Sequence, residues 1–213
     1  MSIEVENLEN SHLNDHPTYD YEKASLDSGF KVVCGIDEAG RGPLAGPVFA
    51  AAVILPLDCE IEGLNDSKKL TEKKREELFD VVIEKALAYS VASASEKEID
   101  EINILNATFL AMRRAYEGLG IKADKALIDG NKKPGLPCEE ETVVKGDAKS
   151  MSIAAASILA KVSRDRYMLE MAKLYPEYQF EKHKGYGTKL HYEMIREHGI
   201  SEIHRLTFLK KMH

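Results

Sequence analysis

The chain has 213 residues, of which 44% are hydrophobic and 31% charged, with 14 Gly and 7 Pro. This length and composition fit one globular domain with a buried core, and they exclude collagen-like, solenoid and wholly disordered chains. No apolar run reaches the roughly 20 residues that a membrane helix needs. The N-terminus also lacks the basic and apolar regions of a secretory signal. We therefore expect a cytoplasmic protein with no membrane association.

The formal net charge of −7 hides a division along the chain. Residues 1–30 carry one basic and seven acidic side chains, residues 31–144 carry 15 and 21, and residues 145–213 carry 13 and 8. Such a chain can hold a polyanion with its basic C-terminal third while the acidic middle gathers metal cations. Solvated faces of mixed sign explain the charges equally well, so charge alone leaves both interpretations open.

The cysteines are Cys34, Cys59 and Cys138, which are odd in number and widely spaced. This pattern argues against a disulfide framework and against a CxxC zinc site. We expect reduced, packed thiols.

The chain begins with a polar, acidic stretch that has no apolar periodicity. This composition predicts a loose arm over residues 1–17, ahead of the first helix and strands. Residues 19–27 predict a short helix that ends near Gly29. A β-rich apolar run predicts a strand over 31–36. After a Gly/Pro-rich turn, a second run predicts a buried strand over 48–55.

The middle of the chain alternates helices with strands. Apolar residues near helical spacing predict a helix over 71–86, behind a threonine that can cap it. A strand is predicted over 88–95 and a second helix over 103–118. Two further short strands, over 125–129 and 142–145, each precede a glycine.

The last third of the chain is mainly helical. The longest helical stretch covers 150–174 and is stopped by Pro176. A basic loop over 182–189 leads into a final amphipathic helix over 190–198.

This order of elements predicts an α/β fold with a mixed sheet flanked by helices. We expect the arm at 1–17, a catalytic domain at 18–174, and a basic helical C-terminal extension at 175–213 that contributes to substrate binding.

Four carboxylates stand at the ends of predicted elements. Asp37 and Glu38 follow the strand at 31–36, Asp129 follows KALI, and Asp147 lies before the long helix. Strand ends converge on one edge of an open α/β sheet, where such sheets place ligands. Carboxylates gathered there repel one another unless cations neutralise them. Hard oxygen ligands suit Mg²⁺ or Mn²⁺, and two such ions can flank the attacking and leaving oxygens of a phosphodiester.

An ordinary structural interpretation of these acids is equally consistent with their spacing. An acid after a strand is commonly a turn residue, and Asp147 can serve as a helix N-cap. The neighbouring Gly40, Arg41 and Gly42 favour the functional interpretation, because two glycines around one residue let the backbone approach a ligand and offer N–H donors. This tripeptide is neither a dinucleotide-binding GxGxxG nor a Walker loop.

Six segments together resemble bacterial ribonuclease HII over roughly residues 18–208. They are GIDEAGRGPLAGPV at 35–48, NDSKKL at 65–70, IDGN at 128–131, KGDAKSMSIAAASILAKVSRDR at 145–166, HKGYGTKLH at 183–191 and HRLTF at 204–208. The resemblance implies a ribonuclease H-like fold with a mixed five-stranded sheet, and metal-dependent endonucleolytic cleavage of RNA hybridised to DNA. It further implies cleavage 5′ to a single ribonucleotide embedded in duplex DNA, leaving 3′-hydroxyl and 5′-phosphate ends.

The resemblance also implies roles for individual residues. The family's catalytic and metal-binding acids fall on the four carboxylates already named: Asp37, Glu38, Asp129 and Asp147. Its ribose-sensing loop falls on Gly40, Arg41 and Gly42, and its sensing tyrosine on Tyr186. Only the 2′-hydroxyl separates RNA from DNA at a given position, so a close backbone and one tyrosine suffice to test for it. Lys68 is expected to hold a substrate phosphate.

The implied cofactors are two divalent ions, Mn²⁺ or Mg²⁺. The implied partners are RNA–DNA hybrid and ribonucleotide-containing duplex DNA, bound by a monomer. Several basic side chains are expected to contact the nucleic-acid backbone, which adds affinity without sequence information. They are Lys161, Arg164, Lys182, Lys184 and Lys189.

Three alternatives remain at this point. A ribonuclease HIII-like nuclease would usually carry a longer N-terminal substrate-binding domain than residues 1–30 can form. A non-catalytic module that binds hybrids would be expected to lack at least one of the four carboxylates. A nucleotide-phosphate-binding protein would need a glycine-rich loop that opens a helix, whereas GRGP leads into a predicted strand.

Overall fold

The computed structural model describes residues 16–210, in which strands and helices share the first two thirds and helices alone follow β5. The strands are β1 (Val33–Ala39), β2 (Val48–Ile54), β3 (Ala88–Ala94), β4 (Lys125–Asp129) and β5 (Glu139–Val143). The α-helices are α1 (Asp20–Asp27), α2 (Glu72–Lys85), α3 (Glu96–Glu117), α4 (Met151–Leu174), α5 (Phe180–His183), α6 (Lys189–His198) and α7 (Leu206–Leu209). Short 3₁₀ helices are η1 (Ser67–Lys69), η2 (Gly146–Ala148) and η3 (Pro176–Tyr178).

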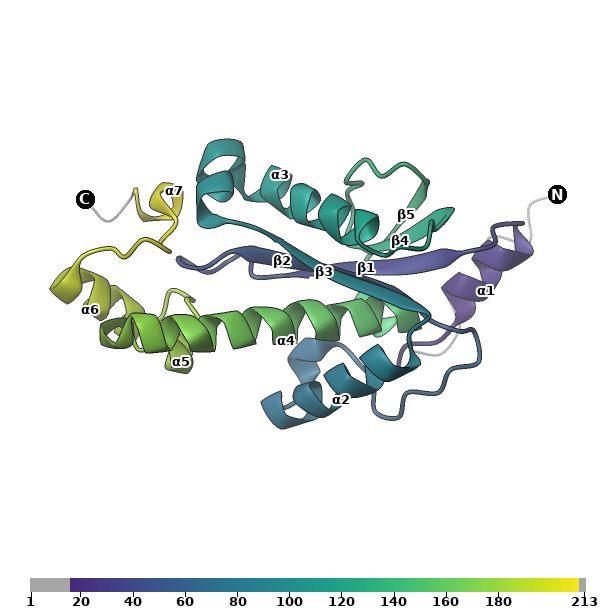
Figure 1. Cartoon of the computed structure of the whole chain (residues 1–213), viewed down its shortest axis with the longest axis horizontal. Helices are drawn as coiled ribbons and strands as arrows, with labels where there is room; N and C mark the ends of the chain where they lie inside the picture. Colours follow the sequence, from purple (N-terminus) through teal and green to yellow (C-terminus); the bar gives the residue numbers. More distant parts are fainter. Residues whose placement is uncertain (1–15, 211–213) are drawn as a thin grey trace.

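The strands form one mixed five-stranded sheet in the order β3-β2-β1-β4-β5. β1 pairs antiparallel with β2, and β2 antiparallel with β3. β1 pairs parallel with β4, and β4 parallel with β5. Figure 1 shows α3 on one face of the sheet and α4 on the other, with α2 packed outside α4. The α/β prediction with a mixed sheet flanked by helices is therefore confirmed.

Small residues bring α4 very close to the central strand. A Cβ built on Gly35 of β1 would lie 2.2 Å from the carbonyl carbon of Ser152, so only glycine fits there. The next turns of α4 bury alanines, including Ala154 and Ala156, against the sheet. This close packing fixes the start of α4, and the segment before it, against β1.

The N-terminus of α4 is held by a buried carboxylate from α1. Glu22 Oε1 accepts hydrogen bonds from Ser150 Oγ at 2.6 Å and from the Ser152 backbone N–H at 2.9 Å. Ser150 Oγ in turn accepts from the N–H of Ile153 at 3.2 Å, so Ser150 is the N-cap. The predicted helix at 150–174 is confirmed, and the interpretation of Asp147 as its N-cap is wrong.

Most other predicted elements are confirmed within one or two residues, including the strands at 48–55, 88–95 and 125–129. Thr71 caps α2, accepting a hydrogen bond from the N–H of Lys74 at 3.2 Å, as predicted. The predicted N-terminal arm falls mainly on residues 1–15, which lie outside the described residues.

Four boundaries differ from the predictions. β1 runs on through Asp37 and Glu38, because its pairing with β2 continues as far as Ala39. β5 covers Glu139–Val143 rather than 142–145, since a strand at the sheet edge can expose its acidic side chains to water.

The predicted start of the second helix and the predicted basic loop were also misplaced. α3 begins at Glu96 behind a capping box formed by Ser95 and Glu98, and Asn103, the predicted start, is a kink with φ of 67°. The basic segment at 182–189 begins inside α5 and ends at the start of α6.

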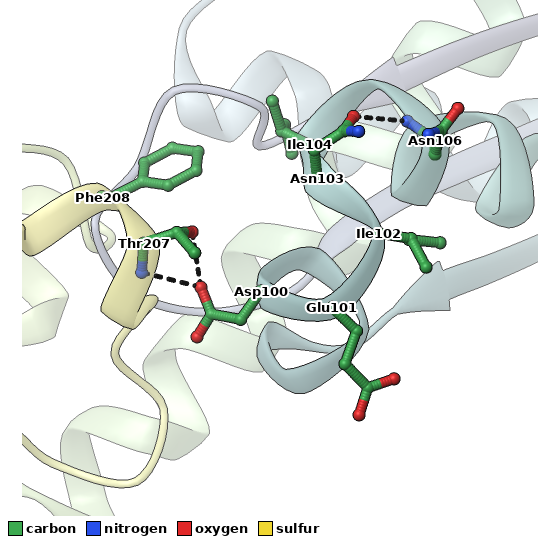
Figure 2. Close-up of a pocket in the computed structure, with 8 residues that line it drawn as sticks. All are labelled: Asp100, Glu101, Ile102, Asn103, Ile104, Asn106, Thr207 and Phe208. Carbon is green, nitrogen blue, oxygen red and sulfur yellow. Dashed lines mark hydrogen bonds between the residues drawn. The ribbon is translucent and has the colours of Figure 1, made fainter.

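The C-terminal α7 docks against the first part of α3. The Asp100 carboxylate accepts hydrogen bonds from the backbone N–H groups of Leu206 and Thr207, at 2.8 and 2.9 Å, and from the Thr207 hydroxyl. Figure 2 shows this contact beside a cavity of about 620 Å³ between α7 and the α3 kink. None of the nine predicted site residues lines this cavity.

Candidate active site

The parallel pairing of β1 with β4 brings the first of the predicted acids together. Ile36 lies opposite Ile128, so Asp37 and Asp129 follow at the next position on adjacent strands. Glu38 is the next residue of β1. The order of strands thus joins acids that lie far apart in the sequence.

Asp147 reaches the same edge through a tight turn after β5. Lys145 adopts the left-handed conformation with φ of 57°, which directs the chain from β5 into η2. The Gly146 N–H then donates a 2.7 Å hydrogen bond to Asp129 Oδ1. A Cβ on Gly146 would lie 2.6 Å from Ile153 Cδ1, so η2 packs closely against α4 at this glycine. Close packing at one glycine therefore holds Asp147 beside Asp129.

Burial and mutual repulsion raise the pKa of three of these carboxylates: Asp37, Glu38 and Asp147. Asp37 is only 5% exposed. Burial, and then the charges of Glu38 and Asp129, raise its pKa well above the ordinary value. Burial also raises the pKa of Glu38, against the opposing effect of Arg41. For Asp147, burial and the Asp129 charge raise the pKa. Cations bound beside these acids would favour their ionised form.

The donor set fits hard divalent cations. Asp, Glu and water oxygens are the ligands that Mg²⁺ and Mn²⁺ prefer. Within residues 16–210, no group of three or more Asp, Glu, His or Cys side chains is arranged so that it could hold a metal ion. Mg²⁺ commonly uses one or two carboxylates and takes its remaining ligands from water and substrate phosphate. The four acids suit that mode of binding.

Lys68 lies at the rim of the acidic cluster. Its Nζ is 3.6 Å from Asp147 Oδ2, and its side chain is 78% exposed. Burial lowers the Lys68 pKa, but the charges of Asp147 and Asp37 outweigh this effect and raise it. A charged, exposed ammonium therefore lies at the rim of the cluster, and its role in holding a phosphate stays a prediction.

Two buried arginines hold the loop that contains Gly40, Arg41 and Gly42. Arg205 donates to the carbonyl oxygens of Gly40 at 2.6 Å, Arg41 at 2.9 Å and Gly46 at 2.8 Å. Arg164 lies directly beneath Gly40, where an added Cβ would be 2.1 Å from its Nε. Both guanidinium groups are fully buried.

Arg164 also joins this loop to the basic segment. It donates to the carbonyl oxygens of Ala45 at 3.2 Å and Lys184 at 3.0 Å. The prediction that Arg164 contacts substrate phosphates is therefore wrong, because its side chain is fully buried and its Nε and Nη2 donate to carbonyl groups inside the protein. Arg205 was not among the predicted site residues, and its place in the HRLTF segment is the signal that could have revealed it.

Tyr186 lies across from Gly42 and is 41% exposed. A Cβ on Gly42 would be 3.9 Å from Tyr186 Cε1, and the Arg164 guanidinium carbon lies 5.5 Å from the ring centroid. The backbone N–H of Leu44 donates to the Gly185 carbonyl at 2.8 Å. The fold thus brings the two predicted substrate-binding segments against each other.

Comparison with known proteins identifies the family. The family model described as Ribonuclease HII matches residues 34–212. The chain belongs to the ribonuclease HII family.

Curated relatives are similar over most of the chain. The ribonuclease HII of Endomicrobium trichonymphae is 62% identical over 191 residues, which is 89% of this chain and 91% of the relative. The ribonuclease HII of Caldicellulosiruptor bescii is 57% identical over 198 residues, which is 93% of this chain and 96% of the relative.

The solved structures agree on the fold. The ribonuclease H2 of Pyrococcus horikoshii OT3 superposes with a TM-score of 0.70 at 32% identity, covering 83% of this chain and 93% of that one. The fold is ribonuclease H-like, and the chain is an endoribonuclease, a hydrolase that acts on RNA–DNA hybrids.

The family match decides among the alternatives left by the sequence. It favours ribonuclease HII over ribonuclease HIII and over a nucleotide-phosphate-binding protein. Across residues 16–210, no helix is long and apolar enough to cross a lipid bilayer.

Proposed function

We propose that this ribonuclease HII cleaves the phosphodiester 5′ to a ribonucleotide, including a single one embedded in duplex DNA, and leaves 3′-hydroxyl and 5′-phosphate ends. The observation that carries the proposal is the position of the acidic cluster beside two loops that can test a sugar. The cluster comprises Asp37, Glu38, Asp129 and Asp147, and the loops carry Gly40–Gly42 and Tyr186.

The four acids would hold two divalent cations, Mg²⁺ or Mn²⁺, together with the substrate phosphate. When bound, these ions supply charge stabilisation at the attacking and leaving oxygens of the scissile phosphate. Asp37 and Glu38 orient their carboxylates from a rigid central strand, and the Gly146 hydrogen bond orients Asp129. Lys68 offers its exposed ammonium to a phosphate oxygen.

The two loops would supply selectivity for the ribonucleotide. The glycines of Gly40–Gly42 let the backbone approach the sugar closely, and the Tyr186 ring can pack on it while its hydroxyl forms a hydrogen bond. We also propose that the enzyme acts as a monomer. We further propose a cytoplasmic location.

The direct test uses a DNA duplex with one internal ribonucleotide, incubated with Mg²⁺, Mn²⁺ or chelator. Nicking 5′ to the ribonucleotide, dependent on metal, is the expected result. An all-DNA duplex of the same sequence is the matched substrate control. Absence of nicking with both metals would contradict the proposal.

Substitutions of Tyr186 should distinguish a role in ribonucleotide recognition from a role in metal binding. We expect Tyr186→Ala to lose about 10²-fold in single-turnover cleavage of the embedded ribonucleotide, because both the ring and the hydroxyl are lost. Tyr186→Phe should lose less, since the ring stays. Calorimetry with Mn²⁺ should show unchanged metal affinity in both variants. Full rescue of Tyr186→Ala by higher metal concentration would instead place Tyr186 in support of the carboxylates.

The basic C-terminal segment should make substrate binding sensitive to salt. We propose that residues 175–213 contact the nucleic-acid backbone through Lys182, Lys184 and Lys189. Replacing these three by glutamine should weaken hybrid binding and reduce the slope of log affinity against log salt by about 2 to 3. Fluorescence anisotropy across a salt series measures this slope.

A control triple variant carries glutamine at Lys23, Lys73 and Lys122, which are exposed on α1, on α2 and before β4. It has the same change of charge and should leave the salt slope close to that of the wild type. Equal slopes for the two triple variants would contradict the assignment of the C-terminal lysines.

A further inference from the structure

Three buried histidines lie beneath the loop that carries Tyr186. His183 ends α5, His191 lies in the first turn of α6, and His204 precedes Arg205. All three are buried, and the rings of His183 and His191 stack with centroids 4.3 Å apart. The activity derived above makes no use of them.

Hydrogen bonds link the rings of His204 and His191 to the backbone of Tyr186. The Ser201 backbone N–H donates to His204 Nδ1 at 2.8 Å. His204 Nε2 lies 3.1 Å from His191 Nε2, and His191 Nδ1 lies 3.0 Å from the carbonyl oxygen of Tyr186. A chain of hydrogen bonds therefore runs from Ser201, which follows α6, through the side chains of His204 and His191 to the backbone of Tyr186.

The groups at the two ends of this chain determine where each proton lies. A carbonyl oxygen can only accept, so His191 must carry its proton on Nδ1, and its Nε2 is left as an acceptor. A backbone N–H can only donate, so His204 must accept at Nδ1 and carry its proton on Nε2. The His204 Nε2–H then donates to His191 Nε2, and every bond has one donor and one acceptor.

The hydrogen-bond partners of His183 determine its tautomer in the same way. Its Nε2 lies 2.9 Å from the Tyr178 carbonyl oxygen and must donate, while its Nδ1 accepts from the Gly185 N–H at 3.2 Å. Burial lowers the pKa of His191 and His204 to about 4, and it also lowers the pKa of His183. The rings are therefore neutral at pH 7, as a chain of alternating donors and acceptors requires.

The segment that contains His204 also holds the Gly40–Gly42 loop. His204 reaches Tyr186 through His191, and its neighbour Arg205 holds the carbonyl groups of Gly40 and Arg41. Two adjacent residues thus set the position of both loops that face the sugar.

We propose that His191 and His204 are positioning residues for ribonucleotide recognition, and that their neutral tautomers hold the backbone of Tyr186 at a set spacing from the Gly40–Gly42 loop. This inference rests on the proposed role of Tyr186. His191 is accordingly protonated on Nδ1, the less common tautomer of free histidine.

Long-range ¹H–¹⁵N correlation spectra of the wild-type protein at pH 7 test the tautomers without reference to activity. We expect His191 protonated on Nδ1 alone, and His204 and His183 on Nε2 alone. Protonation of His191 on Nε2, or of either His191 or His204 on both nitrogens, would overturn the proposal.

Cleavage of the single-ribonucleotide duplex tests the positioning role. His191→Leu removes both bonds of the ring and should lower kcat/KM about 10- to 100-fold. His191→Asn keeps an N–H that can reach the Tyr186 carbonyl and should recover most of that loss. His198→Leu is the control, because His198 is exposed on the same helix and lies outside the chain of bonds.

A double variant distinguishes the positioning role of His191 from the proposed sugar-contacting role of Tyr186. If His191 acts through Tyr186, His191→Leu should cost little further activity in a Tyr186→Ala background. A folded His191→Leu variant with wild-type kcat/KM would refute the positioning role, and so would an equal loss in His191→Asn and His191→Leu. If the Tyr186→Ala variant cleaves normally, the proposed role of Tyr186 fails. The spectra then still test whether His191 and His204 have the tautomers that the chain of hydrogen bonds requires. If His191→Leu does not fold, His191→Asn and the spectra carry the test.

Discussion

Asp37→Asn is expected to abolish most cleavage while leaving a folded and more stable metal-free protein. The substitution removes the charge of a proposed metal ligand, and charge stabilisation of about 4 kcal/mol at the scissile phosphate corresponds to about a thousandfold in rate. Single-turnover cleavage of the embedded-ribonucleotide duplex with saturating metal measures this loss. Near wild-type turnover would mean that the metal site has been misassigned.

The gain in stability follows from the raised pKa of Asp37. Its folded-state pKa lies well above the unfolded value near 4, so the folded state binds the proton more tightly. Raising the pH from about 4 through the folded-state pKa therefore lowers the stability of the metal-free protein. Asp37→Asn should reduce that decline, as measured by denaturant unfolding in chelator at several pH values. Asp80→Asn, an exposed acid on α2, is the control and should leave the decline unchanged.

Gly40→Ala should lower activity by a different route, because it displaces the Gly40–Gly42 loop, which we propose contacts the sugar. The backbone at Gly40 has φ of 97°, and an added Cβ would lie 2.1 Å from Nε and 2.3 Å from Cδ of Arg164. Arg164 is fully buried and bonded to other carbonyl groups, so it has little room to yield. We expect cleavage to fall about 10²-fold, because small displacements of a binding element have effects of that size.

Stability measurements separate backbone strain from the steric clash. The left-handed φ costs alanine about 1–2 kcal/mol, and forcing a methyl group into a packed site costs about 1–3 kcal/mol more. Gly29 has the same φ of 97° with nothing within 4 Å of an added Cβ. Gly29→Ala should therefore show the first cost only and retain activity. Equal effects of the two substitutions would show that the contact with Arg164 is unimportant.

The sequence alone was enough to predict the mixed sheet and the long helix α4, and it singled out four carboxylates that the fold brings together. Alternating apolar runs mark the strands, and small apolar residues mark the helix that packs closely on β1. The boundary errors have local causes. β5 is acidic because it lies at an exposed sheet edge, and Asn103 starts the second part of a kinked helix. Neither feature can be read from apolar periodicity.

The tertiary structure alone decided how the site is held together. Only the parallel pairing of β1 with β4 places Asp129 beside Asp37. Charged and histidine side chains are ordinarily predicted at the surface, yet Arg164, Arg205 and His191 are buried. Their burial is possible because carbonyl groups from distant segments accept their hydrogen bonds, as Gly40 and Gly46 do for Arg205 from more than 150 residues away. Local sequence cannot reveal such acceptors, because only the folded chain brings them within reach.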